Sequence, residues 1–326
     1  MDWVIATGAG GPDALPALQA ALDSGRPGVY VPPGVYHCPG QLFINGDDRR
    51  LHLAAGSVLL KAGAIRNRWG SGFITHGHEV RNSKVNNFRL TGAGIIGAVD
   101  YDASGTMISI WGDDQLYAGI TIDTWSDGIA FLIAGDRIRM RNITTVNPQR
   151  QTGNGGIRFA GGSDFRAEDC HIVSGDDCLQ AVPIQGSFRH PFNDNDIDGA
   201  AYVRCTGWST NARFYAVVLS DKTIPSPNMT ASIRNVSFTD CSGYGGQRGL
   251  AIRNESSTGV IEDVHLRRCT LDQSRAVLAP TRIDAIVSRE PGAGPCRNIT
   301  LEEFDLIDPQ GQGFATEGDV EDVRQI

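Results

Sequence analysis

The sequence predicts an all-β solenoid, a single-stranded parallel β-helix with one helix at its N-terminal end. The chain has 326 residues and 40 glycines, which indicates many tight turns. From about residue 41 onward, short apolar segments recur between glycine, asparagine and aspartate, and no further helical pattern interrupts them. In the second half, four similar segments close on Cys170, Cys205, Cys241 and Cys269, at intervals of 35, 36 and 28 residues. Such a period with loops of varying length is typical of a solenoid.

Residues 11–25 form the one segment with a convincing helical pattern. Its apolar residues fall on one face: Ala14, Leu15, Leu18, Ala21 and Leu22. Asp13 is placed to cap the start of this helix, and Gly25 is placed to end it. The helix and the following Gly-Val-Tyr-Val-Pro-Pro-Gly-Val-Tyr of residues 28–36 together resemble the opening of pectate-lyase-type right-handed β-helix proteins. The resemblance implies that the helix covers the first coil and shields its open edge.

We expect one domain over residues 1–326. It comprises a capping-helix region over residues 1–25, β-helix coils over about residues 26–310 and a polar tail over residues 311–326. A βαβ fold would need regular helices between the strands, and a sandwich would show shorter and more even spacing. Neither pattern is present, and no segment reads as a linker between domains.

Composition narrows the classes of partner and compartment. The formal net charge of −8 argues against nucleic acid as a partner, since phosphate-binding proteins usually carry a basic excess. No stretch of about 20 apolar residues exists, so we expect no membrane insertion. The seven cysteines are odd in number, which favours buried thiols over a disulfide framework. The N-terminus lacks the basic and apolar regions of an export signal. We therefore expect cytoplasmic synthesis, followed by association with a virion or export by a signal absent from this chain.

The stretch around Asp176 and Asp177 is the strongest candidate site. Two short strand-like segments flank it, and Gly175 precedes the acidic pair. Adjacent residues on a strand point to opposite faces, so the two carboxylates share a surface only if the chain bends, as Gly175 permits. Two carboxylates on one exposed face repel, so one of them holds its proton near neutral pH. That is the acid and base pairing that glycoside cleavage needs, although Gly-Asp-Asp is also ordinary turn chemistry.

Two segments carry a more specific resemblance. Residues 169–178, Asp-Cys-His-Ile-Val-Ser-Gly-Asp-Asp-Cys, resemble the Asn-Cys-x-Ile-x-x-Gly-Asp-Asp-Cys segment of glycoside hydrolase family 28, the polygalacturonase family. Residues 249–264 resemble that family's Gly-x-Arg-Ile-Lys segment and the strand after it. The resemblance implies that Asp176 is the general acid and that Asp177 is the base that activates water. It also implies that Arg253 binds a substrate carboxylate or hydroxyl; a surface arginine beside Glu255 is the other interpretation.

This chain departs from the family pattern at three places. The family has Asn-Thr-Asp one coil before Gly-Asp-Asp, and here Gly155 stands in place of that aspartate. The family's Gly-His-Gly should lie near residues 206–213, which contain no histidine. In the Arg-Ile-Lys segment, Ala251 replaces the arginine and Arg253 replaces the lysine. Two of the three family carboxylates and one positive charge therefore remain.

Further substrate-binding candidates lie around the pair. Arg158 lies one coil before it and Arg213 one coil after it, so both side chains are candidates for the same groove. His171 precedes the pair by five positions, which places it near the cleft or in the core. Residues 186–200 form a long insertion whose Arg189 is suited to hydrogen bonding with sugars. Each of these residues also has an ordinary structural interpretation.

The same insertion holds a candidate metal site. Asp194, Asp196 and Asp198 alternate before Gly199, as at the front of a calcium loop. The twelfth position is Cys205 instead of glutamate, which excludes an EF-hand. A calcium loop of another kind and a polar turn both remain, and we expect no required cofactor.

The function that these observations favour is hydrolysis of a polysaccharide, an acidic one because arginines lie near the acidic pair. One alternative is a phage or phage-like tail spike or fibre, a homotrimer that binds cell-surface polysaccharide with little or no catalysis. The missing export signal, the odd cysteine count and the eroded motif fit that alternative. A further alternative is a uronate polysaccharide lyase or epimerase on the same fold, which would use a lysine, arginine or tyrosine base, sometimes with calcium, for which the aspartate triplet would supply ligands.

Overall fold

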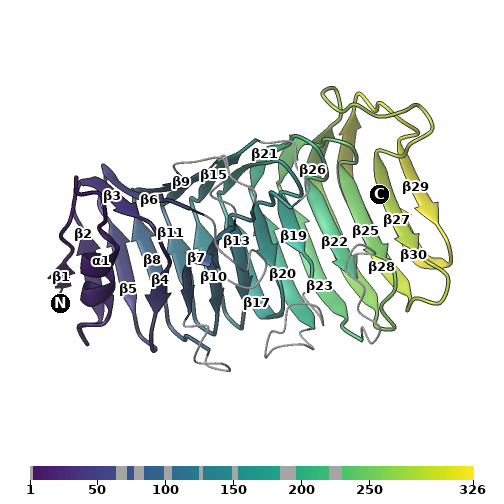
Figure 1. Cartoon of the computed structure of the whole chain (residues 1–326). Coiled ribbons are helices and arrows are strands. Elements are labelled where there is room, and N and C mark those ends of the chain that lie inside the picture. The colour runs from purple at the N-terminus through teal and green to yellow at the C-terminus, as the bar shows by residue number, and fades with distance from the viewer. Residues whose placement is uncertain are drawn as a thin grey trace.

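The computed structural model of the chain confirms the predicted parallel β-helix (Figure 1). It describes residues 3–63, 72–76, 84–98, 105–124, 128–148, 153–183, 196–219 and 230–326. The strands stack along one axis, and each pairs in parallel with the equivalent strand of the next coil. The N-terminus lies at one end of the stack and the C-terminus at the other.

Three rows of strands form the sides of the coil. The first row of the 20-stranded sheet, which we call row 1, contains β1 (Trp3–Ile5), β2 (Gly28–Val31), β5 (Arg50–Leu53), β8 (Arg89–Gly92), β11 (Leu116–Ala118), β14 (Arg139–Arg141), β17 (Gly162–Glu168), β20 (Ile197–Val203), β23 (Ile233–Thr239), β26 (Ile261–Asp272), β28 (Cys296–Ile307) and β30 (Val320–Gln325). Row 2 of the same sheet contains β3 (Gly34–Cys38), β6 (Ser57–Lys61), β9 (Ile95–Ala98), β12 (Thr121–Asp123), β15 (Thr144–Asn147), β18 (His171–Ser174), β21 (Thr206–Ser209) and β24 (Ser242–Tyr244), and the later halves of β26 and β28 continue it. Row 3 is the 10-stranded sheet of β4 (Leu42–Ile44), β7 (Gly72–His76), β10 (Thr106–Trp111), β13 (Phe131–Ala134), β16 (Ile157–Phe159), β19 (Leu179–Ala181), β22 (Tyr215–Leu219), β25 (Leu250–Asn254), β27 (Ala285–Arg289) and β29 (Phe314–Glu317).

The corner between rows 1 and 2 is a single left-handed residue in most coils. Asp169 (φ 54°) and Asp240 (φ 54°) are examples, and aspartate tolerates this backbone region better than most residues do. Each pairs across the corner with an arginine of the next coil, Arg204 and Arg268 respectively. The predicted cysteine ladder follows directly after these corners and points inward, and all seven cysteines are buried and free. The interpretation of those thiols as core packing is confirmed.

The single helix of the described chain, α1 (Leu15–Leu22), packs beside β2, β3 and β4 at the N-terminal end (Figure 1). It is shorter than the predicted span of residues 11–25. The carboxylate of Asp13 does accept a hydrogen bond from the N–H of Leu15 (2.9 Å). Pro16 sits in the first turn, where its missing N–H removes no helical bond, and the chain leaves the helix before Gly25 adopts a positive φ (76°).

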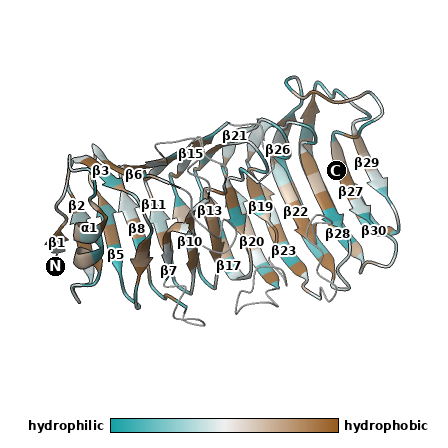
Figure 2. Cartoon of the chain, in the orientation of Figure 1, coloured by the Kyte–Doolittle hydropathy of each residue, from teal (hydrophilic) through white to brown (hydrophobic). Residues whose placement is uncertain are grey.

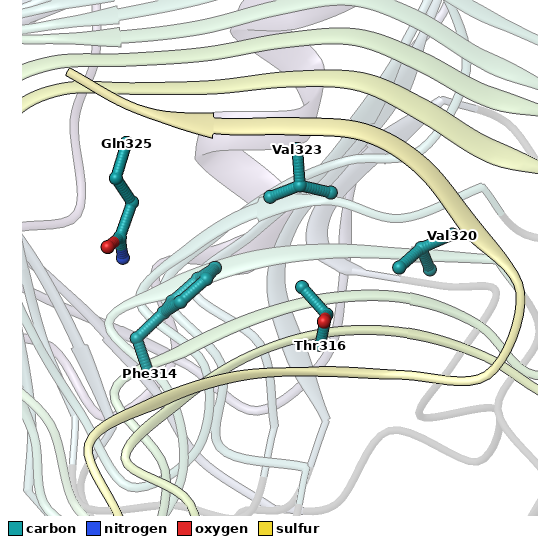
Figure 3. Close-up of a pocket in the computed structure, with 5 residues that line it drawn as sticks. All are labelled: Phe314, Thr316, Val320, Val323 and Gln325. Carbon is teal, nitrogen blue, oxygen red and sulfur yellow. The ribbon is translucent and has the colours of Figure 1, made fainter.

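The C-terminal end differs from the predicted tail. Residues 311–326 contribute β29 and β30, which continue the coil, because Phe314, Val320 and Val323 pack against the core. These three side chains, together with Thr316 and Gln325, line an open pocket of about 360 Å³ at this end (Figure 3).

Hydrophobic side chains line the inside of the coil throughout. Brown and teal alternate along the strands in Figure 2, as expected for sheets with one buried and one outer face. Aromatic rings contact one another from coil to coil: the rings of Phe165 and Tyr202 are tilted with centroids 5.3 Å apart, and those of Tyr202 and Phe238 are stacked with centroids 4.9 Å apart. Within the described ranges, no helix is long and apolar enough to span a bilayer.

Candidate active site

The acidic pair lies at the corner where row 2 passes into row 3, between β18 and β19. The chain bends at Gly175 and Asp176, as predicted. Four hydrogen bonds hold this bend. The hydroxyls of Ser174 (2.7 Å) and Ser209 (2.8 Å) both donate to the carbonyl oxygen of Asp176, and the N–H groups of Gly175 and Asp176 donate to the carbonyl of Asn154 (3.1 Å each). Both serines and Asn154 are fully buried, so the bend is built into the core of three coils.

The carboxylate of Asp176 is half-buried and carries a raised pKa. Burial is the main cause and the nearby charge of Asp177 adds to it, so the pKa of Asp176 rises to about 6. One hydrogen bond acts in the opposite direction, because Oδ2 of Asp176 accepts the N–H of Gly153 at 2.6 Å. Asp176 is therefore a carboxyl group that holds its proton up to a mildly acidic pH.

Asp177 differs from the expectation of an exposed carboxylate, since only 5% of the residue is accessible. Arg213 of the next coil covers it: Oδ1 of Asp177 accepts bonds from Nε (2.6 Å) and from the backbone N–H (3.2 Å) of Arg213. Burial alone would lower the pKa of Arg213, but the charge and hydrogen bond of Asp177, together with the charges of Asp176 and Glu255, outweigh burial and hold that pKa above its usual range. Among the described residues, no hydrogen bond is made to Oδ2 of Asp177, so this oxygen remains for a water molecule.

The two carboxyl groups thus differ in environment although they are adjacent in sequence. Asp176 faces a neighbouring negative charge and a backbone N–H, whereas Asp177 faces a guanidinium. Two carboxyl groups in different surroundings can serve as the acid and the base of an active site. The arrangement can donate a proton from Asp176 and accept one at Asp177.

The place of the absent third aspartate is filled by another side chain. A Cβ atom built on Gly155 would lie 2.4 Å from Nε2 of Gln180. That amide donates to the carbonyl oxygen of Asp177 (2.7 Å), so Gln180 supports the bend at the acidic pair from row 3. The resemblance to family 28 did not identify Gln180, Ser174 or Ser209. The sequence feature that could have identified them is their position beside Gly-Asp-Asp, in the same coil or in the next.

Arg253 lies on β25, two coils beyond β19, and is largely engaged by the protein. Its Nη1 lies 2.9 Å from Oε1 of Glu255 and its Nη2 lies 3.5 Å from Oε1 of Glu290, while Nε donates to the hydroxyl of Ser288 (3.0 Å). Its side chain is 19% exposed. In the structure Arg253 is therefore an arginine paired with Glu255, the second of the two interpretations.

The three other predicted binding residues, Arg158, His171 and Arg189, are not seen to contact the acidic pair. Arg158 lies on the outer face of β16, where Nε (3.1 Å) and Nη2 (3.4 Å) donate to the carbonyls of Val182 and Pro183. His171 is exposed on β18 in row 2, with Nδ1 3.0 Å from the hydroxyl of Thr206, and it lies in a different sheet from β19. Arg189 lies outside the described residues.

The predicted calcium loop is only partly within the described chain, since Asp194 lies outside it. Oδ1 of Asp196 accepts the N–H of Ser232 (2.8 Å), and Oδ1 of Asp198 accepts a bond from the side chain of Asn235 (2.6 Å). Both carboxylates thus link one coil to the next. Across the described ranges, no three His, Cys, Asp or Glu side chains gather in a geometry that could hold a metal ion.

The sequence contains a second Gly-Asp-Asp, at residues 112–114, and the chain bends there too. This triplet follows the row 3 strand β10 instead of preceding one. Asp114 pairs with Arg137 at an exposed corner (2.7 Å). The position of a Gly-Asp-Asp in the coil, and not the triplet alone, therefore distinguishes the candidate site.

Comparison with known proteins finds a likeness in fold to solved structures. No family model matches the sequence, and no curated protein matches it. Solved structures do match. The family 28 exopolygalacturonase of Yersinia enterocolitica is 16% identical, with a TM-score of 0.57 over 99% of this chain and 78% of that one. The iota-carrageenase of A. fortis is 13% identical, with a TM-score of 0.59 over 98% and 88% of the two chains.

A third match is the endo-xylogalacturonan hydrolase of Aspergillus tubingensis, 13% identical, with a TM-score of 0.53 over 99% of this chain and 93% of that one. At these identities the likeness shows the fold, a right-handed parallel β-helix of the kind that glycoside hydrolases use. The predicted handedness and the resemblance to family 28 are thereby confirmed at the level of fold. The activity of this chain needs its own argument.

Proposed function

We propose that the protein is a glycoside hydrolase that cleaves an acidic polysaccharide, with Asp176 as general acid and Asp177 as general base. The observation that carries the proposal is the contrast between the two adjacent carboxyl groups. Burial and Asp177 raise the pKa of Asp176 to about 6, while Asp177 is ion-paired with Arg213 at 2.6 Å. A carboxyl group with that pKa is roughly nine-tenths protonated at pH 5, as a proton donor to a leaving oxygen must be.

The reaction balances with these two groups and water. Asp176 gives its proton to the glycosidic oxygen as the bond between that oxygen and the anomeric carbon breaks. Water attacks the anomeric carbon and loses a proton to Asp177. Arg213 fixes the Asp177 side chain through Oδ1 and leaves Oδ2 for the water. The products are a new reducing end and a new non-reducing end.

An acidic polymer is favoured by local charge. The net charge of the chain is −8, but Arg213 contacts the acidic pair, and Arg248 lies near enough to feel the charges of Arg213, Arg253 and Arg282. Local potential governs the approach of a charged substrate more than net charge does. Arginine is also the side chain best suited to carboxylate and sulfate groups.

The direct test is sugar release from a panel of acidic and neutral polysaccharides by the wild type, Asp176→Asn and Asp113→Asn. Asp113→Asn is a matched control because it makes the same change in the other Gly-Asp-Asp. New reducing ends without new ultraviolet absorbance, lost only in Asp176→Asn, are the expected result.

Other results would redirect the assignment. Normal cleavage by Asp176→Asn would refute the role of the acidic pair. An unsaturated product that absorbs in the ultraviolet would indicate a uronate lyase. Tight binding of a polysaccharide with no cleavage by any of the three proteins would favour a glycan-binding protein of the tail-spike kind.

A further inference from the structure

One corner position repeats through the coils around the acidic pair. Gly155, Asp177, Arg213 and Arg248 each lie two residues before the first paired residue of a row 3 strand, and those strands are in register (Ile157, Leu179, Tyr215 and Leu250). The strand registers carry this alignment, and backbone bonds join the corners of consecutive coils: the N–H of Cys178 donates to the carbonyl of Arg213 (2.9 Å), and the N–H of Phe214 donates to the carbonyl of Gly249, the residue after Arg248 (2.9 Å). The corner column therefore reads glycine, aspartate, arginine, arginine. Strand spacing places the backbone of Arg248 about 10 Å from that of Asp177.

Arg248 differs from the other arginines near the pair, because its guanidinium makes no ion pair in the described part of the chain. Arg213 is held by Asp177, and Arg253 by Glu255 and Glu290. For the guanidinium of Arg248, the described residues supply neither an ion pair nor a hydrogen bond, although the residue is half-buried.

The surroundings of Arg248 make its positive charge unfavourable. Burial lowers the pKa of Arg248, and the like charges of Arg253, Arg213 and Arg282 lower it further, against the attraction of Glu317. A partly desolvated cation that makes no ion pair is costly to hold in a folded protein. A bound anion would supply the missing counter-charge and the missing hydrogen-bond acceptors.

The backbone under Arg248 is fixed before any ligand arrives. The N–H groups of Arg248 (3.2 Å) and Gly246 (3.1 Å) both donate to the carbonyl of Ala212 in the preceding coil. A Cβ on Gly246 would lie 2.5 Å from the backbone nitrogen of Asn211, so the loop packs this closely only because glycine is there. A preformed position lowers the entropy lost when a ligand binds.

We propose that Arg248 binds the carboxylate or sulfate group of a sugar that neighbours the cleaved bond, on the C-terminal side of the acidic pair along the stack. This inference rests on the proposed function, which identifies the ligand as a sugar polymer. It assigns the recognition of the acidic group to Arg248, and not to Arg253 of the motif.

The first test does not depend on cleavage. The side-chain Nε–Hε resonance of Arg248 is followed by ¹⁵N NMR in the wild-type protein and is assigned by its loss in Arg248→Gln. D-galacturonate and inorganic sulfate are the probes, with D-galactose and chloride at matched ionic strength as controls. A saturable shift with galacturonate or sulfate and none with the controls is expected, and the tighter of the two anions indicates the acidic group. No shift with either anion, or an equal shift with chloride, would overturn the proposal.

The second test uses the polymer that the wild type cleaves, before and after chemical reduction of its carboxylates or removal of its sulfates. Arg248→Gln should lower kcat/KM for the charged polymer about tenfold or more, since a charge-assisted bond is lost. It should leave the neutralised polymer within about twofold of the wild type. Arg267→Gln, which removes the same charge from the outer face of row 1, should change neither.

The two proposals fail differently. If the ratio of kcat/KM for the charged and neutralised polymers is the same in Arg248→Gln as in the wild type, Arg248 does not bind the acidic group. The proposal of hydrolysis by the acidic pair is not affected by that result. If no polymer is cleaved, the hydrolase assignment fails, and the NMR titration alone decides whether Arg248 binds an anion.

Discussion

Asp176→Asn should make the protein more stable at neutral pH, although it should abolish cleavage. The pKa of Asp176 is about 6 in the folded chain against an ordinary value of 3.8, with burial and Asp177 as the causes. The folded state therefore binds this proton more tightly than the unfolded state does. The resulting stabilisation is present below about pH 4 and is lost as the pH rises through 6. At about 1.4 kcal/mol for each pKa unit, the loss for a half-buried group amounts to about 2–3 kcal/mol at pH 8.

Asparagine has no charge to desolvate, and its carbonyl oxygen still accepts the N–H of Gly153. Urea unfolding followed by tryptophan fluorescence should show equal free energies of unfolding for the variant and the wild type at pH 4, and a gain of about 2–3 kcal/mol for the variant at pH 8. Asp240→Asn is a control of opposite sign. The hydrogen bond from Arg268 lowers the pKa of Asp240, so that variant should lose stability at pH 8 and lose less at low pH. An Asp176→Asn variant that is less stable than the wild type at pH 8, or whose difference from it does not change with pH, would refute this account of the site.

Three further variants test other parts of the structure. Arg213→Ala leaves the buried charge of Asp177 unpaired and should lower the free energy of unfolding by about 3 kcal/mol. Adding Asp177→Asn should restore part of that loss. If Arg213→Ala costs the same with Asp177 as with Asn at position 177, the ion pair is contradicted. The carboxylate of Asp284 accepts the N–H groups of three residues near the C-terminal end, so Asp284→Ala should lower the free energy of unfolding by about 3 kcal/mol. It should also speed hydrogen exchange in residues 310–313, and unchanged exchange there would contradict this role of Asp284. His171→Ala should leave cleavage within about twofold of the wild type because its ring lies on row 2, and a large loss of kcat would place it in the site after all.

Much of the fold could be predicted from the sequence because a solenoid repeats its signals. The cysteines at corresponding corners, the glycine-rich turns and the N-terminal amphipathic segment each point to the same architecture. The last coil was missed because residues 311–326 are short and polar on their outer face. Only their inward side chains, such as Phe314 and Val323, show that they belong to the stack.

The site was predicted less completely, for a physical reason. The Gly-Asp-Asp triplet identifies the bend, but the residues that set its electrostatics come from other coils at irregular distances along the chain. Arg213 lies 36 residues beyond Asp177, and a variable coil length hides that partnership from sequence alone. The motif likewise pointed to Arg253, whose carboxylate partners are visible only in the structure. Arg248 had a usable signal, since it precedes its row 3 strand by the same two residues as Arg213 does.

The central claim is that Asp176 donates the proton that breaks the glycosidic bond. The pH dependence of kcat/KM on the cleaved polymer tests it most directly, because that profile reports the pKa of the essential acid in the free enzyme. We predict that kcat/KM falls as the pH rises through about 6, the pKa that burial and Asp177 give to Asp176, and that Asp176→Asn has no measurable rate at any pH. A rate that stays constant or rises between pH 6 and 8 would contradict the claim.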